Sequence, residues 1–139
     1  MSSPEWRNAI LNLLNQGKGF EVDYEGDSIK VLETRGISKA SINIKEIKGV
    51  KKGKTRPPPQ KLRDLIVSLS SRLVAAKKKF RVTLGQGDFV LRFDLDHYVR
   101  VDSTSSYVVG FESLDEDPIN VIVEILRAHG SVEVLKPLR

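Results

Sequence analysis

Three charged residues in the first third of the chain have the types that a metal-dependent reaction on phosphate esters requires. Asp27 opens an alternating apolar stretch, and Glu46 and Lys48 lie two residues apart in the segment "INIKEIK". In a strand this spacing directs both side chains to one face. Because two carboxylates can bind Mg²⁺ and a lysine can orient the attacking water, the pattern indicates a nuclease site, with solvent-facing charges as the alternative.

A second group of charges is concentrated between residues 45 and 63. This window holds eight lysines and arginines against the single acid Glu46, whereas the whole chain of 139 residues has a net charge of +5, so the remainder is slightly acidic. Its central loop carries Lys51, Lys52, Lys54 and Arg56. The prolines at 57–59 are expected to stiffen its exit into a helix. A basic patch on a nearly neutral body indicates a polyanionic partner, with a plain solvated connector as the alternative.

A third group lies in the second half, on the face of a predicted hairpin opposite its apolar residues. It comprises Arg81 and Arg92, which Tyr98 and Arg100 join if the next strand keeps the same sense. Arginines for phosphates and aromatic rings for bases are what single-stranded nucleic acid requires. The alternative is a half-buried antiparallel sheet with ordinary polar residues outside.

Other chemistries have little support in the sequence. The chain has no cysteine, and His97 and His129 lack a second ligand at metal-like spacing, so no metal or other cofactor is expected unless the nuclease site binds Mg²⁺. Gly85-Gln86-Gly87 lacks the following helix that a phosphate-binding loop needs. The sequence also contains neither a signal peptide nor a membrane span, so a cytoplasmic protein without a membrane partner is expected.

The elements that must position these residues can be predicted in the first half from apolar spacing. A helix is predicted from Ser3-Pro4-Glu5, followed by a hairpin over 20–31 that turns at 25–28. Residues 37–50 are ambiguous between a strand and a helix, and a strand or a short mixed segment is favoured. A long helix is predicted from Gln60, because leucines recur at helical spacing as far as Leu73.

The second half of the sequence is predicted to form mainly strands. Phe80 to Leu84 and Phe89 to Leu95 alternate on either side of a glycine-rich turn, which predicts a hairpin with all seven apolar residues toward the core. Strands around Val99 and Tyr107 follow on either side of a polar turn over 103–106. They are followed by a helix capped by Asp117-Pro118 that ends at His129-Gly130, with His129 as its C-cap residue, and by an edge strand over 132–135. The order predicts one compact α+β domain over 1–139, with an antiparallel sheet and about four helices.

A shift of sixty residues superimposes two helix-hairpin units, 3–32 and 60–95, with the basic loop 48–59 between them. Phe20 and Val22 fall on Phe80 and Val82. The match indicates an internal duplication, while the alternative is that any helix followed by a tight hairpin looks similar.

The first third resembles the PD-(D/E)xK nuclease family, particularly the archaeal Holliday-junction resolvases. The stretches "RNAILNLLNQGKGFEV", "DSIKVL" and "INIKEIK" are similar to that family's helix, hairpin and E-x-K strand. The resemblance implies that Asp27 and Glu46 bind Mg²⁺, that Lys48 is the catalytic lysine and that Glu5 is the helix acid. The family's proline before the first acid is missing here.

The layout of the whole chain resembles the archaeal ThermoDBP and ThermoDBP-related proteins. A small cysteine-free basic domain has its halves linked by "KKGKTRPPPQKLRDLI". The resemblance implies an apolar cleft flanked by basic residues that binds single-stranded DNA or RNA, and the chain has no C-terminal heptads for a zipper. Single-stranded nucleic-acid binding is therefore the leading expectation, the nuclease is second, and a protein-interaction module is third.

Overall fold

The computed structural model describes residues 5–34 and 57–135. The first half forms α1 (Glu5–Asn15), β1 (Gly19–Glu25), β2 (Ser28–Thr34) and α3 (Gln60–Ala75). The second half forms β3 (Phe80–Leu84), β4 (Asp88–Arg92), β5 (Tyr98–Asp102), β6 (Ser105–Val109), α4 (Ile119–His129) and β7 (Ser131–Leu135). The predicted α+β class is confirmed. The ambiguous segment 37–50 lies outside the described residues.

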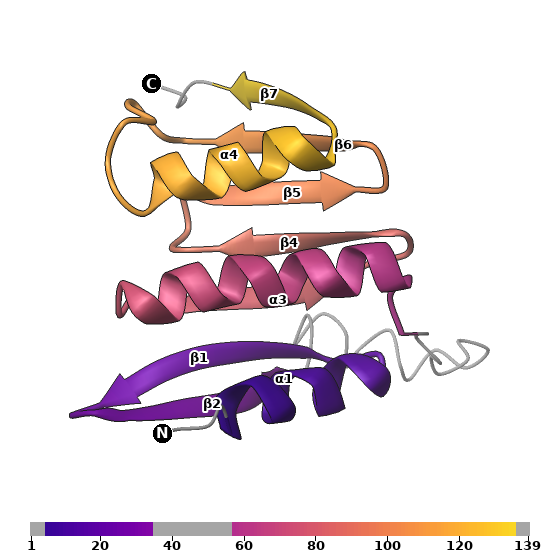
Figure 1. The fold of residues 1–139 in the computed structure, drawn as a ribbon, viewed down its shortest axis with the longest axis vertical. Helices are drawn as coiled ribbons and strands as arrows, with labels where there is room; N and C mark the ends of the chain where they lie inside the picture. Colours follow the sequence, from indigo (N-terminus) through magenta and orange to yellow (C-terminus); the bar gives the residue numbers. More distant parts are fainter. Residues whose placement is uncertain (1–4, 35–56, 136–139) are drawn as a thin grey trace.

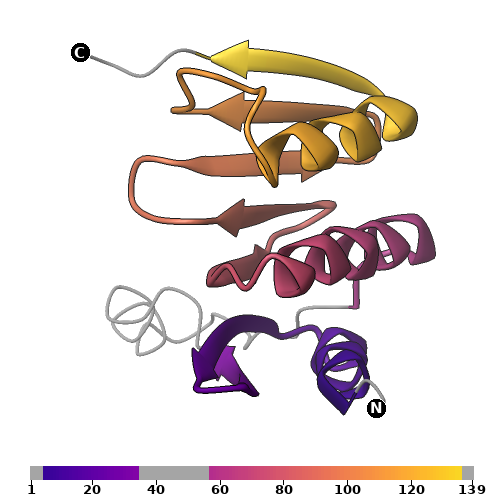
Figure 2. The same cartoon turned by 60° about the vertical axis from the view of Figure 1, so that its left-hand side comes forward.

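All seven described strands belong to one sheet, in the order β2-β1-β3-β4-β5-β6-β7. Neighbouring strands are antiparallel except β6 and β7, which are parallel. In Figure 1 the helices α1, α3 and α4 all lie in front of the strands, and Figure 2 shows them together on one side of the sheet. In the described part of the chain, the other face carries no helix, and we call it the open face.

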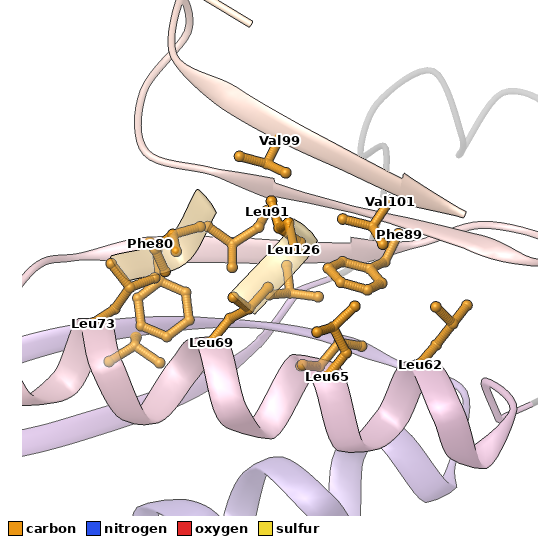
Figure 3. Packing of buried hydrophobic residues seen from close by; sticks show 14 of the residues in the cluster. Leu62, Leu65, Leu69, Leu73, Phe80, Phe89, Leu91, Val99, Val101 and Leu126 are labelled. Atoms are coloured by element: carbon orange, nitrogen blue, oxygen red, sulfur yellow. The ribbon is translucent and has the colours of Figure 1, made fainter. Parts of the chain in front are cut away.

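The hydrophobic core fills the space between the helices and the sheet. The leucines of α3 recur on one side of the helix, and Leu62, Leu69 and Leu73 are almost completely buried. Figure 3 shows these leucines pointing toward Phe80, Phe89 and Leu91 of the sheet. Burial of each such side chain contributes about 1.5 to 3 kcal/mol to the stability of the fold. Apolar packing therefore holds the helices against this face of the sheet.

The β3–β4 hairpin forms as predicted, but its second strand is shorter. The turn between the strands places Gly87 at a φ of 84°, a conformation that glycine adopts without strain. Strand β4 ends at Arg92. The carboxylate of Asp94 then accepts the backbone N–H groups of Asp96 and His97, which turns the chain. The prediction that Leu95 faces the core is therefore wrong, since Leu95 is 83% exposed.

Three details of the C-terminal third also differ from the prediction. Strand β7 is parallel to its neighbour because α4 carries the chain back across the sheet before β7 begins. Strand β6 begins at Ser105, within the stretch predicted as a turn, and buries Ser106 and Val108. The N-cap of α4 is Pro118, without a side-chain hydrogen bond, so Asp117 does not cap the helix as predicted.

The two predicted helix-hairpin units meet where β1 pairs with β3. Their first strands pair antiparallel, with Phe20 opposite Val82, Glu21 opposite Arg81 and Val22 opposite Phe80. This register is symmetric about Glu21 and Arg81, the two positions that a shift of sixty residues equates. The symmetry supports the duplication, which stays a prediction.

Candidate nucleic-acid interface

Side chains on the open face line up in rows that run across the strands. The first row is defined by successive cross-strand partners: Leu32, Glu21, Arg81, Arg92, Tyr98, Val109 and Leu135. The second row is Thr83, Val90, Arg100, Tyr107 and Glu133. Their neighbours along β3 to β6 are buried under the helices, so alternation places both rows away from the core.

Two arginines of these rows lie over tyrosine rings of the adjacent strand, and we call them the Arg–Tyr pairs. The guanidinium carbon of Arg92 is 4.7 Å from the centroid of the Tyr98 ring, and that of Arg100 is 5.7 Å from the Tyr107 ring. Both distances lie within the range of a cation–π interaction, which contributes about 0.5 to 1 kcal/mol at exposed sites. The pairs hold two rings and two guanidinium groups in fixed positions on adjacent strands.

Carboxylates partly neutralise this face. Arg81 Nη2 lies 3.2 Å from Glu21 Oε1, and Arg100 Nη2 lies 2.9 Å from Asp88 Oδ2. Within residues 5–34 and 57–135, Arg92 has no acidic partner. Among the described residues, the open face therefore has one guanidinium without a carboxylate partner, that of Arg92. The guanidinium groups of Arg81 and Arg100 would have to leave a carboxylate before they could bind a phosphate.

The structure brings together the four predicted binding residues that it describes. Arg81, Arg92, Tyr98 and Arg100 lie on the same face of three consecutive strands. Sequence reasoning missed Tyr107, the cross-strand partner of Arg100. The buried Val108 beside it was the available signal, but a serine at the other core position of β6 obscured the alternation. The loop residues Lys51, Lys52, Lys54 and Arg56 lie outside the described residues.

The predicted nuclease residues are only partly described. Asp27 lies in the turn between β1 and β2, where its exposed carboxylate is 3.6 Å from Lys77 Nζ. Glu5 is the exposed first residue of α1. Glu46 and Lys48 lie outside the described residues, and among those that are described no three His, Cys, Asp or Glu side chains are grouped so as to hold a metal ion.

One end of the open face borders a pocket of about 830 Å³. It lies between the loop that leads into β5 and the segment that follows β6, and its lining includes His97, Tyr98, Val109, Phe111 and Glu112. At the start of that second segment, Gly110 has a φ of 93°, and a β-carbon there would collide with the carbonyl oxygen of Asp96. The close approach of the two segments therefore depends on glycine.

The imidazole of His97 is fixed in this pocket from two sides. Its Nδ1 lies 2.7 Å from Asp94 Oδ1, and its ring is 5.1 Å from the Phe111 ring, which in turn packs edge-on against Phe93. The hydrogen bond to His97, together with those from the backbone, lowers the pKa of Asp94 below its ordinary value. The side chain that orients the His97 imidazole is therefore the ionised carboxylate of Asp94.

The opposite end of β5 is tied to the helices. Asp102 Oδ1 accepts the backbone N–H groups of Thr104 and Ser105, and these bonds lower the pKa of Asp102. His129, predicted as a C-cap residue, is instead the last residue of α4, whose C-cap is Gly130, and its Nε2 donates to the carbonyl oxygen of Asp102 at 2.8 Å. Lys61 of α3 donates to the carbonyl of Ser103. These bonds fix the strands that carry Arg100 and Tyr107.

Comparisons of this chain with protein-family models, with curated proteins and with solved structures gave no match. None of the helices in the described ranges combines the length and the apolar character that a membrane crossing needs. Function is therefore inferred from the geometry of the open face.

Proposed function

We propose that the protein binds single-stranded nucleic acid across the open face of its sheet. The observation that carries the proposal is the two Arg–Tyr pairs, in which a guanidinium group lies over a tyrosine ring on the open face. A base can stack on a tyrosine ring irrespective of its identity, and a neighbouring arginine can contact the phosphate. The expected binding is therefore tolerant of sequence over most of the strand.

The arrangement of the pairs favours single strands over duplexes. Tyr98 lies opposite Val109, two residues from Tyr107, so the two tyrosines are diagonal neighbours on adjacent strands. Diagonal neighbours in a sheet are about 7 to 8 Å apart, which allows each ring to take its own base. In a duplex the base faces are stacked on one another and are not accessible to the rings.

The test is a fluorescence anisotropy titration with a labelled oligonucleotide of about 16 nucleotides, single-stranded or annealed to its complement. We expect tighter binding of the single strand, with affinity that falls between about 50 and 200 mM salt. Tyr98→Ala and Tyr107→Ala should weaken binding, whereas Tyr98→Phe and Tyr107→Phe retain the stacking surface and should bind nearly normally.

Matched controls come from the helix side of the molecule. Arg72 of α3 and Arg127 of α4 are exposed arginines on elements that cover the other face. Arg92→Ala should make the negative slope of log affinity against log salt shallower by about 0.7, the value for one lost phosphate contact on a single strand. The variants Arg72→Ala and Arg127→Ala should leave that slope unchanged. Absence of binding at low salt, or equal losses in the control variants, would overturn the proposal.

The nuclease prediction is tested in parallel reactions with Mg²⁺. Single-stranded, duplex and four-way-junction DNA are incubated with the protein and analysed for cleavage. Mg²⁺-dependent cleavage that disappears in Glu46→Ala would support the metal site at Asp27 and Glu46. Cleavage that persists in that variant would remove the assigned site.

A further inference from the structure

The pocket beside Tyr98 is continuous with the proposed binding surface. Tyr98 and Val109 are cross-strand partners in the first row of the open face, and both also line the pocket. Its volume of about 830 Å³ falls in the range of sites that enclose small organic ligands. A strand bound along the open face would therefore reach the pocket at one of its ends.

The imidazole in the pocket presents a defined hydrogen-bonding group. Asp94 Oδ1 can only accept, so the His97 nitrogen that lies 2.7 Å from it, Nδ1, carries the hydrogen. In the neutral ring the other nitrogen, Nε2, is then an acceptor. Nε2 has no hydrogen-bond partner among the described residues. The edge-on contact of the ring with Phe111 keeps this nitrogen in place.

The remaining polar side chains of the lining are mostly acceptors too. Asp96, Glu112 and Glu116 contribute carboxylates, and among the described residues neither a lysine nor an arginine lines the pocket. The hydroxyl groups of Tyr98 and Ser113 can donate or accept. A phosphate group would be repelled here, whereas a ligand with N–H₂ groups and an aromatic face would satisfy the acceptors and pack on the ring of Phe111.

We propose that this pocket receives one base of the bound strand and selects bases that carry an exocyclic amino group. The proposal rests on the function proposed above. Cytosine and adenine present such an amino group on their pairing edge, whereas thymine and uracil present two carbonyl oxygens and a single N–H. In the pocket these carbonyl oxygens would lie against other hydrogen-bond acceptors, which is unfavourable. The rest of the strand, over the Arg–Tyr pairs, remains tolerant of sequence.

The experiment compares strands that differ by one amino group. An all-thymine oligonucleotide is compared in competition anisotropy with strands carrying a single 5-methylcytosine at the 5′ end, at the 3′ end or in the middle. Thymine and 5-methylcytosine have the same methyl group, so the comparison isolates the amino group and the adjacent ring nitrogen. We expect about two- to tenfold tighter binding when the substitution is at one particular end, and no change when it is in the middle.

Variants assign the preference to the pocket. His97→Ala and Glu116→Ala, which remove an acceptor from the pocket, should abolish the preference for the 5-methylcytosine strand over the all-thymine strand. Glu124→Ala, at an exposed position of α4 outside the pocket, is the matched control and should retain the preference. Circular dichroism verifies that each variant is folded.

The outcomes separate this proposal from the one on which it rests. Equal affinity for all strands, with binding retained, would overturn the pocket and leave the open face intact. A preference that persists in both pocket variants would also overturn it. Absence of binding to every strand would overturn the proposed function itself.

Discussion

The two faces of the sheet are built from the same strands but differ in what covers them. In β4, Phe89 and Leu91 are buried under α3, whereas Val90 and Arg92 between and beside them lie on the open face. The helix-covered face is closed by apolar packing, while the open face combines half-buried aromatic and apolar residues with charges. Alternation along one strand therefore separates residues that stabilise the core from residues on the open face, so substitutions of adjacent residues should have different consequences.

The largest expected effect is on the helix-covered face. Phe89→Ala removes a ring that is 1% exposed and should lower the free energy of unfolding by about 3 to 5 kcal/mol, because a cavity remains in the core. Val90→Ala, the next residue along the strand, should cost less than about 1 kcal/mol. Urea denaturation monitored by circular dichroism measures both. Similar losses for the two variants would break the distinction between the faces.

The second prediction concerns Tyr98 on the open face, where a substitution should affect binding more than stability. Tyr98→Ala should weaken binding of single-stranded nucleic acid by about 1 to 3 kcal/mol, the value of one stacked base. Its unfolding free energy should change by much less than that of Phe89→Ala, since Tyr98 is only half-buried. Anisotropy and urea denaturation on the same sample give both values. If Tyr98→Ala is destabilised as strongly as the core variant, the open face is part of the core.

The third prediction is a dependence of stability on pH at the end of β5. The folded pKa of Asp102 is lowered below 3.8 by the N–H groups of Thr104 and Ser105. Its contribution to stability is therefore present above pH 3.8 and is lost as the pH falls through the lowered pKa. Asp102→Asn, whose amide oxygen can still accept both bonds, should lose less stability on acidification than the original chain.

Asp102→Ala is the companion variant. It removes the acceptor and should cost about 0.5 to 1.5 kcal/mol even at neutral pH. Thermal unfolding at neutral pH and at about pH 3 distinguishes the two variants. An equally steep loss on acidification in Asp102→Asn would show that Asp102 does not contribute. Asp23 and Asp94, whose pKa values are also lowered, supply the dependence that remains.

The smallest expected effect lies at the end of α3, away from both faces. Lys77 follows the C-cap with a φ of 55°, a conformation that costs less for glycine. Lys77→Gly should therefore stabilise the protein by about 0.5 to 1 kcal/mol. Lys77→Ala keeps the unfavourable backbone and removes the exposed ion pair with Asp27, so it should change stability little. A loss of stability in Lys77→Gly would indicate that the ion pair outweighs the backbone.

Much of the fold was predictable because its periods are local properties of the sequence. The leucines of α3 and the alternation in β1, β3 and β5 indicate which side chains face the core. The alternation failed at Leu95, where the hydrogen bonds of Asp94 turn the chain, and at Ser106, a polar residue in a core position. The parallel direction of β7 was not predictable, since a local pattern does not specify a strand's partner.

The candidate site was predictable only where it lies on regular strands. Period-two spacing places Arg81, Arg92, Tyr98 and Arg100 on one face. The pocket was missed because it forms between two loop segments on either side of the β5–β6 hairpin, the loop before β5 and the segment that begins at Gly110. Its formation depends on tertiary contacts that no spacing rule describes.

The junction between β1 and β3 has a consequence for the order of folding. Strands β3 to β6 follow one another directly in the sequence, whereas Glu21 and Arg81, at the centre of the β1–β3 pairing, are 60 residues apart. Closing a long loop costs entropy before any contact compensates for it, so we expect the β3–β6 meander to form first and the β1–β2 hairpin to join it late. Pulsed hydrogen exchange during refolding should then protect amides of β4 and β5 before those of β1.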